Sequence, residues 1–310
     1  MISNKESNFV SVIVYIYNNA KVLRSFMERL YNELETHFSK YEIICVNDDS
    51  TDNSVEILTE FSKNIKHGTI SLVNMSFHQG CEASMNAGMD LTIGDFVFEF
   101  DHANENIPIE KMYEVYQHSL KGYDIVSAAP HKSTKPLHRV FYWIFNHFSY
   151  LHTQIKSEVF RIISRRAINR CQSLGKYIPF RKAIYADSGL KIDTLYYDNI
   201  KEIKNTEDQG KLFNTAIDAL ILFTNAANKV IMALTFSFIV ICFAVFLYIL
   251  YIYFNAKPIA GWTTIMLFLS FGFFNIFLVL SIIMKYQSVL ISLVFKNKSY
   301  VTQSIEKLTK

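Results

Sequence analysis

The stretch that decides the fold is "YEIICVNDDSTDNSVEIL", residues 41–58. It begins with an apolar run of the length and composition that is typical of a buried strand. The polar segment "NDDSTD" follows directly, and "NSVEIL" then opens a stretch with the pattern of a helix. A strand, an acidic loop and a helix in this order predict one unit of a sheet whose strands alternate with helices.

The same alternation extends to both sides of this stretch. Strands are predicted at 10–17, 41–47, 68–75, 94–100 and 123–129, and helices at 20–38, 53–65, 81–93 and 108–120. This pattern predicts an α/β domain with a mostly parallel, Rossmann-like sheet and helices on both faces. Ligands bind such sheets at the carboxyl ends of the strands. The acidic segments "NDDSTD" and "DHANEN" both fall at that edge.

Composition excludes some classes of function. The 310 residues carry a net charge of only +3, and no long basic run with interleaved aromatic residues is present. We therefore expect no nucleic-acid partner. The four cysteines have no C-x-x-C spacing, which favours free thiols in a reducing compartment over a metal or redox site.

The last third of the chain changes in character. Two runs, 230–254 and 259–284, contain no charged residue. Each is long enough to cross a hydrocarbon core of roughly 30 Å, so they predict a transmembrane hairpin. Lysines that follow the second run place both termini in the cytoplasm by the positive-inside rule. The amphipathic segment before the hairpin, 211–229, predicts either an interfacial helix or a connecting helix packed on the globular domain.

Three segments carry a resemblance to a known family: "VNDDSTDNSVEIL", "GCEASMNAGMDLTIGDFVFEFD" and "IAGWTT". They resemble inverting glycosyltransferases with the GT-A fold, of the membrane-bound type that acts on polyprenyl phosphate, such as the bactoprenol glucosyltransferase and dolichyl-phosphate mannosyltransferase group. The resemblance implies transfer of a sugar from a UDP- or GDP-sugar to a polyprenyl phosphate lipid, for cell-envelope glycan synthesis or modification. It also implies a multi-pass protein of the inner or plasma membrane with a cytoplasmic catalytic domain.

The predicted organisation is a GT-A-like domain at 1–210, an interfacial helix at 211–229, two transmembrane helices at 230–284 and a cytoplasmic juxtamembrane tail at 285–310. This organisation is compatible with a homo-oligomer. It places a nucleotide-binding sheet beside a membrane hairpin, where a soluble donor and a lipid-borne acceptor can meet.

The resemblance assigns six residues to the nucleotide-sugar site, and one of them, Asp101, also belongs to the metal motif described below. Tyr17 and Asn18 match the motif that ends the first strand near the base. Asp48 matches an aspartate that hydrogen-bonds the base, although an aspartate there also suits a turn or a helix cap. Gly80 matches a glycine that packs closely beside the nucleotide. Asp95 matches a carboxylate that either faces the donor or holds the edge of the sheet.

Asp101 matches the first aspartate of the D-x-D motif that holds Mg²⁺ or Mn²⁺ in this family, and the resemblance makes it a candidate catalytic residue. The second aspartate is replaced by Ala103, so one expected oxygen ligand is absent. Three neighbours are candidate substitute ligands: Glu99 by strand alternation, His102 as a nitrogen ligand suited to Mn²⁺, and Glu105. Catalysis with a weak metal or none is the alternative.

The segment "FRIISRRAI", residues 160–168, is similar to a basic motif of the same family. Arg161 and Arg165 are its candidate phosphate-binding residues, because guanidinium groups match phosphate bidentately, and Arg161 is a second candidate catalytic residue. Val159 stands where the family has an acidic residue, with Glu158 one position earlier. These departures leave open a catalytically inactive homologue that binds nucleotide sugar or scaffolds a partner in the same pathway.

Overall fold

We analysed a computed structural model of the chain. It describes residues 5–131, 136–149, 153–156, 158–174, 180–198, 261–295 and 300–309, together with single positions between 217 and 251. The predicted interfacial helix at 211–229 and the first predicted span at 230–254 lie outside the described residues, apart from those single positions.

The described residues form a mixed sheet of eight strands in the order β7-β5-β6-β4-β1-β2-β3-β8. The strands are β1 (Glu6–Ile16), β2 (Phe38–Asn47), β3 (Thr69–Met75), β4 (Phe96–Phe100), β5 (Ile125–Pro130), β6 (Phe160–Ser164), β7 (Ile192–Tyr197) and β8 (Thr302–Lys307). Strands β1 to β4 run parallel to one another, as do β5 and β7. Strands β6 and β8 pair antiparallel with their neighbours. The predicted α/β domain with a mostly parallel sheet is confirmed.

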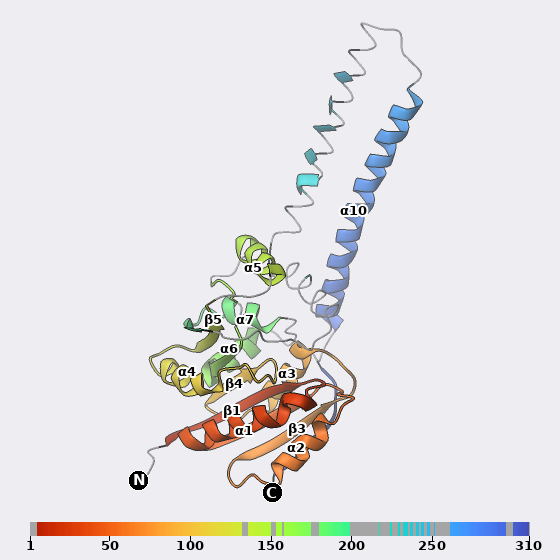
Figure 1. The fold of residues 1–310 in the computed structure, drawn as a ribbon. Helices are drawn as coiled ribbons and strands as arrows, with labels where there is room; N and C mark the ends of the chain where they lie inside the picture. Colours follow the sequence, from red (N-terminus) through yellow and green to blue (C-terminus); the bar gives the residue numbers. More distant parts are fainter. Residues whose placement is uncertain are drawn as a thin grey trace.

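Helices cover both faces of this sheet (Figure 1). Side chains of α1 (Ala20–His37), α2 (Ser54–Ser62) and α4 (Met112–Ser119) join one core cluster, and those of α3 (Cys81–Leu91), α6 (Arg165–Leu174) and α7 (Arg181–Asp187) join the other. Strand alternation divides β1 between the two clusters, with Val12 and Val14 in the first and Ile13 and Tyr15 in the second. The remaining described helices are the 3₁₀ turn η1 (Ile109–Lys111), α5 (Pro136–Phe148) and α10 (Trp262–Phe295).

Left-handed residues shape the loops at the carboxyl ends of β1 and β2. Asn18 has φ 52° and Asp49 has φ 57°, a region that Asn and Asp tolerate better than most residues. Asp52 ties the two loops together, because its carboxylate accepts hydrogen bonds from the backbone of Ala20 at 2.8 Å and of Ser54 at 3.1 Å. The starts of α1 and α2 are thereby fixed to each other at this edge.

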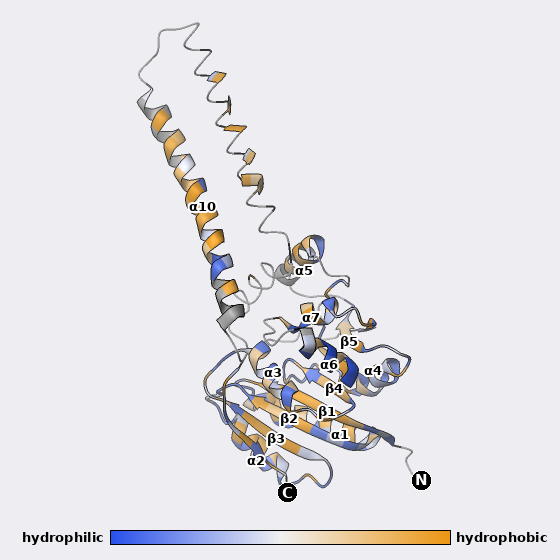
Figure 2. Ribbon diagram, turned by 180° about the vertical axis from the view of Figure 1, so that it is seen from behind, coloured by the Kyte–Doolittle hydropathy of each residue, from blue (hydrophilic) through white to orange (hydrophobic). Residues whose placement is uncertain are grey.

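The end of the chain differs from the predicted juxtamembrane tail. Within the segment 285–310, α10 continues to Phe295, and residues 302–307 form β8 against β3. Figures 1 and 2 show α10 extending away from the sheet, while the C-terminus lies at the far end of the domain beside α2 and β3. The end of the chain therefore belongs to the globular domain.

Across the part of the chain that the structure describes, no helix combines the length and the hydropathy that crossing a membrane requires.

Gly88 allows α3 to lie close to the sheet. A Cβ atom there would come within 2.6 Å of Ile13 Cγ2 and 2.9 Å of Val46 Cγ2. We therefore expect Gly88→Ala to lower the free energy of unfolding by about 1–3 kcal/mol, because the methyl group would overpack the core. Equilibrium unfolding in urea measures this change, and an unchanged midpoint would show that α3 can move aside at no cost.

Candidate active site

Asp48 anchors the loop that precedes α3. Its fully buried carboxylate accepts hydrogen bonds from the backbone N–H groups of Gln79 and Gly80, both at 2.7 Å, and from the Tyr15 hydroxyl at 3.0 Å. We call residues 76–80 the 76–80 loop. The sequence analysis expected Asp48 to contact the base of the donor or to cap a turn. In the structure its oxygens are turned inward and fix the 76–80 loop to the end of β2.

An aromatic pair lies over this anchored loop. The rings of Tyr17 and His78 stack with centroids 3.9 Å apart and an interplanar angle of 12°. His78 Nδ1 lies 2.8 Å from Asp48 Oδ2, and 18% of the His78 side chain is exposed. Tyr17 was predicted from the sequence as a site residue, whereas His78 was not. The only signal for it was its place in "FHQG", just before Gly80.

Two further predicted residues lie at the same edge. Asn18 Oδ1 accepts a hydrogen bond from the backbone of Thr51 at 2.9 Å, which joins the loops after β1 and β2. Gly80 has φ 95°, a conformation that L side chains rarely adopt, so the backbone requires glycine there. The structure therefore brings Tyr17, Asn18, Asp48 and Gly80 together at one edge of the sheet.

Asp101, at the end of β4, belongs to a closed ring of charges. Arg161 donates to Glu99 Oε2 and Asp101 Oδ2, both at 2.7 Å. Arg181 donates to Glu99 Oε1 at 2.9 Å and to Asp101 Oδ1 at 2.7 Å. Each guanidinium thus bridges both carboxylates, and we call these four residues the arginine–carboxylate ring. Glu99, Asp101 and Arg161 were predicted from the sequence as site residues, whereas Arg181, which begins the short helix α7, was not.

Burial and ion pairing act in opposite directions on the two carboxyls of the ring. Burial raises the pKa of the Glu99 carboxyl, which also accepts a hydrogen bond from the Tyr185 hydroxyl at 3.0 Å. Burial also opposes ionisation of Asp101, but the guanidinium groups of Arg161 and Arg181 outweigh it and hold its pKa below the ordinary value. Asp101 is therefore an anion whose charge the two arginines compensate.

The predicted metal site at Asp101 does not fit the residues present. All four carboxylate oxygens of Glu99 and Asp101 already accept hydrogen bonds from guanidinium groups, so a divalent cation would face two positive charges. Ala103 is 2% exposed and packs in the core cluster beneath α1 and α4. His102 packs edge-on against the ring of Tyr15, and Glu105 is exposed.

Over the residues that the structure describes, no three His, Cys, Asp or Glu side chains come together as a metal site. The substitute ligands that the sequence analysis considered therefore do not assemble around Asp101. The physical reason is that Arg161 and Arg181 already saturate the carboxylates that would have to turn toward the metal.

Two predicted site residues have structural contacts at the amino end of β4, the opposite end from the ring. Asp95 Oδ2 accepts a hydrogen bond from the backbone of Phe9 at 2.9 Å. Arg165 donates to the carbonyl oxygens of Gly94 at 2.9 Å and Thr92 at 3.0 Å. Of the two roles considered for Asp95, the structure supports the holding of the sheet edge. The assignment of Arg165 to a phosphate is corrected, since its guanidinium caps a turn of the backbone.

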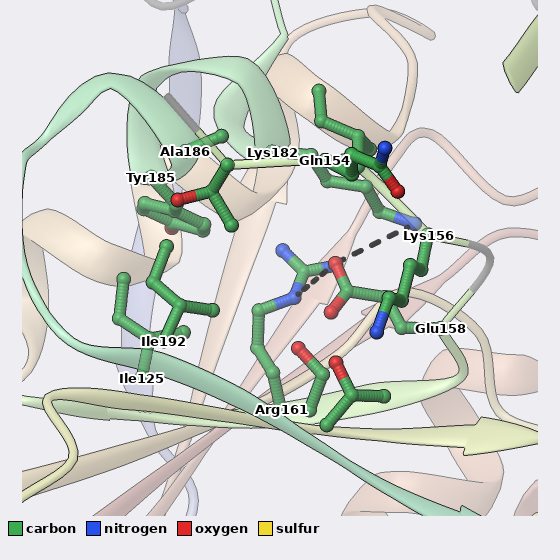
Figure 3. A pocket seen from close by; sticks show the side chains of 13 residues that line it. Ile125, Gln154, Lys156, Glu158, Arg161, Lys182, Tyr185, Ala186 and Ile192 are labelled. Carbon is green, nitrogen blue, oxygen red and sulfur yellow. Dashed lines mark ion pairs between the residues drawn. The ribbon is translucent and has the colours of Figure 1, made fainter. Parts of the chain in front are cut away.

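A small cavity of about 40 Å³ lies beside the ring, between β5, β7 and α7 (Figure 3). Arg161, Lys156, Lys182 and Glu158 contribute to its lining. Glu158 Oε1 lies 3.1 Å from Arg161 Nε and 3.7 Å from Lys182 Nζ. We call this cavity the Glu158 pocket. It has room for about three water molecules or one small anionic group.

The ring should be essential for stability. Replacing Arg181 by Met would leave the buried carboxylate of Glu99 and the partly exposed carboxylates of Glu82 and Asp101 without one of their partners. We expect Arg181→Met to lower the free energy of unfolding by about 3–5 kcal/mol. The control is Arg24→Met, which removes an exposed pair and should cost less than about 1 kcal/mol. Similar losses in the two variants, measured by urea unfolding in detergent, would contradict this prediction.

Guanidinium groups occupy all four carboxylate oxygens of Glu99 and Asp101, so we predict that this site binds divalent metal ions weakly. We expect electron paramagnetic resonance of free Mn²⁺ to show no protein-bound ion with a dissociation constant below about 1 mM, the weak limit of protein cation sites. His102→Ala and Glu105→Gln should leave that titration unchanged. A Mn²⁺ site with a dissociation constant below this limit that disappears in either variant would support the metal site predicted at Asp101.

Comparison with known proteins identifies the family of the chain. Residues 11–176 match the family described as "Glycosyl transferase family 2". The chain is 24% identical over 288 residues to the "Uncharacterized glycosyltransferase YkcC" of Bacillus subtilis, covering 89% of this chain and 87% of that protein. It is 26% identical over 232 residues to the "Undecaprenyl-phosphate 4-deoxy-4-formamido-L-arabinose transferase" of Pectobacterium atrosepticum, covering 72% and 69%.

Among solved structures, "Mannosyltransferase PcManGT from Pyrobaculum calidifontis in complex with GDP-Man and Mn2+" matches with a TM-score of 0.46 and 17% identity, over 73% of this chain and 65% of that chain. The family match covers more than half of the 310 residues. The chain therefore belongs to glycosyl transferase family 2 and is a glycosyltransferase with a mostly parallel GT-A fold.

Proposed function

We propose that this glycosyltransferase moves a sugar from a nucleotide-diphosphate sugar to a polyprenyl phosphate at a membrane surface, in the synthesis or modification of a cell-envelope glycan. The observation that carries the proposal is the Glu158 pocket. It places two lysines directly beside the arginine–carboxylate ring, and Arg161 belongs to both.

The donor side is supported by the edge of the sheet that carries the 76–80 loop. The Tyr17–His78 pair offers an aromatic platform, and nucleobases stack on such side chains. The Sγ atom of Cys81, at the start of α3, lies 3.5 Å from the backbone oxygen of Asp101. A UDP- or GDP-sugar bound over the 76–80 loop would therefore extend its diphosphate and sugar toward the ring.

The acceptor side is supported by the charges of the Glu158 pocket. Burial opposes the charge of Lys182, but neighbouring Tyr142 and Glu158 outweigh it and raise the pKa of its ammonium group. Lys156 extends over the ring of Tyr196, 5.2 Å from its centroid. Lys156 and Lys182 therefore provide two cations for a phosphate group next to Arg161.

The proposed reaction does not require a strong general base at this pocket. An oxygen of the acceptor phosphate, already an anion, attacks the anomeric carbon of the sugar. The bond from that carbon to the nucleoside diphosphate breaks, and the diphosphate leaves with the electron pair. Positioning of the two phosphates is then the main task of the protein, which suits fixed cations better than a strong base.

Exposed apolar surface on α10 and α5 supports the proposed location at a membrane. Figure 2 shows most of the described part of α10 as hydrophobic. Large apolar side chains along this helix are exposed, and Phe277, for example, is 65% exposed. On α5, Trp143 is also 65% exposed, and tryptophan favours membrane interfaces. Figures 1 and 2 place α5 and the near end of α10 at the same end of the domain. We propose that the two uncharged runs of the sequence form a membrane hairpin and that the catalytic domain and both termini are cytoplasmic.

The comparison supports the class of acceptor. The printed name of the Pectobacterium atrosepticum relative specifies undecaprenyl phosphate, and the match covers 72% of this chain. A lipid phosphate is therefore the acceptor that both the pocket and this relative favour.

A transfer assay tests the proposal. Full-length protein in detergent is given labelled UDP- and GDP-sugars with polyprenyl phosphate. We expect a labelled lipid to form, and Lys182→Met to raise the KM for polyprenyl phosphate about tenfold or more while the KM for the donor stays unchanged. This is the loss expected when a hydrogen bond to a charged group is removed. Lys182→Arg, which keeps the charge, should recover most of the affinity.

A lysine far from the pocket provides the control. Lys63→Met, at the end of α2, should leave both KM values unchanged. No labelled lipid with any donor, while UDP or GDP still binds, would reject the lipid acceptor and support the inactive nucleotide-sugar-binding homologue. An equal rise in both KM values of Lys182→Met would show that the pocket does not separate the acceptor from the donor.

A further inference from the structure

The C-terminal segment of the chain holds the 76–80 loop through a two-point contact. Gln79 Nε2 donates to the backbone oxygen of Val301 at 2.6 Å, and Gln79 Oε1 accepts from the backbone N–H of Val301 at 2.9 Å. The backbone N–H of Ser76 also donates to the Val301 oxygen at 3.1 Å. The side-chain amide of Gln79 thus pairs with the backbone as a neighbouring strand would.

The segment that carries Val301 is itself fixed to the sheet. Strand β8 pairs antiparallel with β3, and Asn74 Nδ2 donates to Ser304 Oγ at 3.0 Å. The backbone of Leu308 donates to the carbonyl of Ile70 at 2.8 Å, and Thr309 Oγ1 accepts from the Ile70 N–H at 3.0 Å. Val301 therefore provides a rigid support for the loop.

Gln79 connects this support to the anchor beneath the loop. Its backbone N–H donates to Asp48, while its side chain pairs with Val301. The residues on either side of it are His78, which forms the aromatic pair with Tyr17, and Gly80, which precedes α3. The conformation of the whole loop is therefore set from two sides by one residue.

We propose that the pairing of Gln79 with Val301 positions the 76–80 loop for the donor nucleotide, so that β8 is a working part of the donor site. The proposal rests on the nucleotide-sugar site proposed above. Val301 lies six positions after Phe295, the last residue of α10. The same segment therefore links the apolar helix of the membrane end to the loop that receives the soluble donor.

Binding of UDP and of GDP to the full-length protein in detergent, measured by calorimetry, tests this inference. Gln79→Leu keeps the size of the side chain but removes both hydrogen bonds to Val301. We expect the nucleotide that binds the wild type to bind about tenfold more weakly, since each lost hydrogen bond contributes on the order of 1 kcal/mol. In the transfer reaction, the KM for the donor should rise and kcat should stay within twofold.

Two further variants separate positioning from general stability. Gln79→Glu keeps the acceptor for the Val301 N–H but loses the donor, so its affinity should fall by at least as much as that of Gln79→Leu, because two oxygens then oppose each other. Tyr300→Phe removes the hydrogen bond from Tyr300 to Asp90 Oδ2 at 2.6 Å, in the same segment, and leaves the Gln79 pair intact. We expect Tyr300→Phe to bind the nucleotide within twofold of the wild type.

Amide hydrogen exchange reports whether the loop has been released. The backbone N–H groups at positions 79 and 80 should exchange faster in Gln79→Leu than in Tyr300→Phe. Faster exchange with unchanged nucleotide affinity would overturn the positioning role. Equal loss of affinity in Gln79→Leu and Tyr300→Phe would also overturn it. Failure of the wild type to bind either nucleotide would reject the donor site and this proposal with it, whereas failure of lipid transfer alone would leave it standing.

Discussion

The arginine–carboxylate ring is the interaction on which the rest of the site depends. Glu99 and Arg161 face each other across the antiparallel pair of β4 and β6, and Arg181 adds α7 to them. Arg181 also contacts Glu82 on α3 at 2.9 Å. Four elements from distant parts of the sequence are thereby joined at one buried point. A buried ion pair is costly to desolvate, and it is tolerated here because each guanidinium has carboxylates on more than one side.

The ring also separates two different surfaces. On one side lie the 76–80 loop and the Tyr17–His78 pair, which are held by Asp48. On the other side lies the Glu158 pocket with its lysines. Arg161 belongs to both the ring and the pocket, because its Nη atoms bind the ring and its Nε atom lies beside Glu158. A charge-compensated centre between the proposed nucleotide surface and the Glu158 pocket suits a reaction in which two phosphate-bearing molecules must be aligned.

The sequence predicted the strands and helices whose structure is determined by the local pattern of apolar and polar residues. Apolar runs followed by acidic loops and amphipathic helices predicted β1 to β5 and α1 to α4, because burial on two faces leaves a strong local signal. The sequence did not predict strand β8. Its segment "TQSIEK" is mostly polar and exposed, and it becomes a strand only by pairing with β3. Arg181 and His78 were also not predicted as site residues, because contacts between distant segments leave no local signal in the sequence. Asp95 and Arg165 were assigned to the site from the resemblance, and their contacts with the backbone of Phe9, Thr92 and Gly94 leave no local signal in the sequence.

Ala103 shows why the incomplete D-x-D motif is not a simple loss of one ligand. Its side chain points into the core beneath α1 and α4, whereas Tyr185, which contacts the ring, belongs to the core on the opposite face of the sheet. A carboxylate at position 103 would therefore be buried among apolar groups without approaching the side chain of Asp101. With Arg161 and Arg181 bound to both oxygens of Asp101, the described residues after β4 do not bring carboxylates together around a cation in this structure. The alanine and the two arginines are thus parts of one arrangement, in which fixed guanidinium groups provide the positive charge next to Asp101.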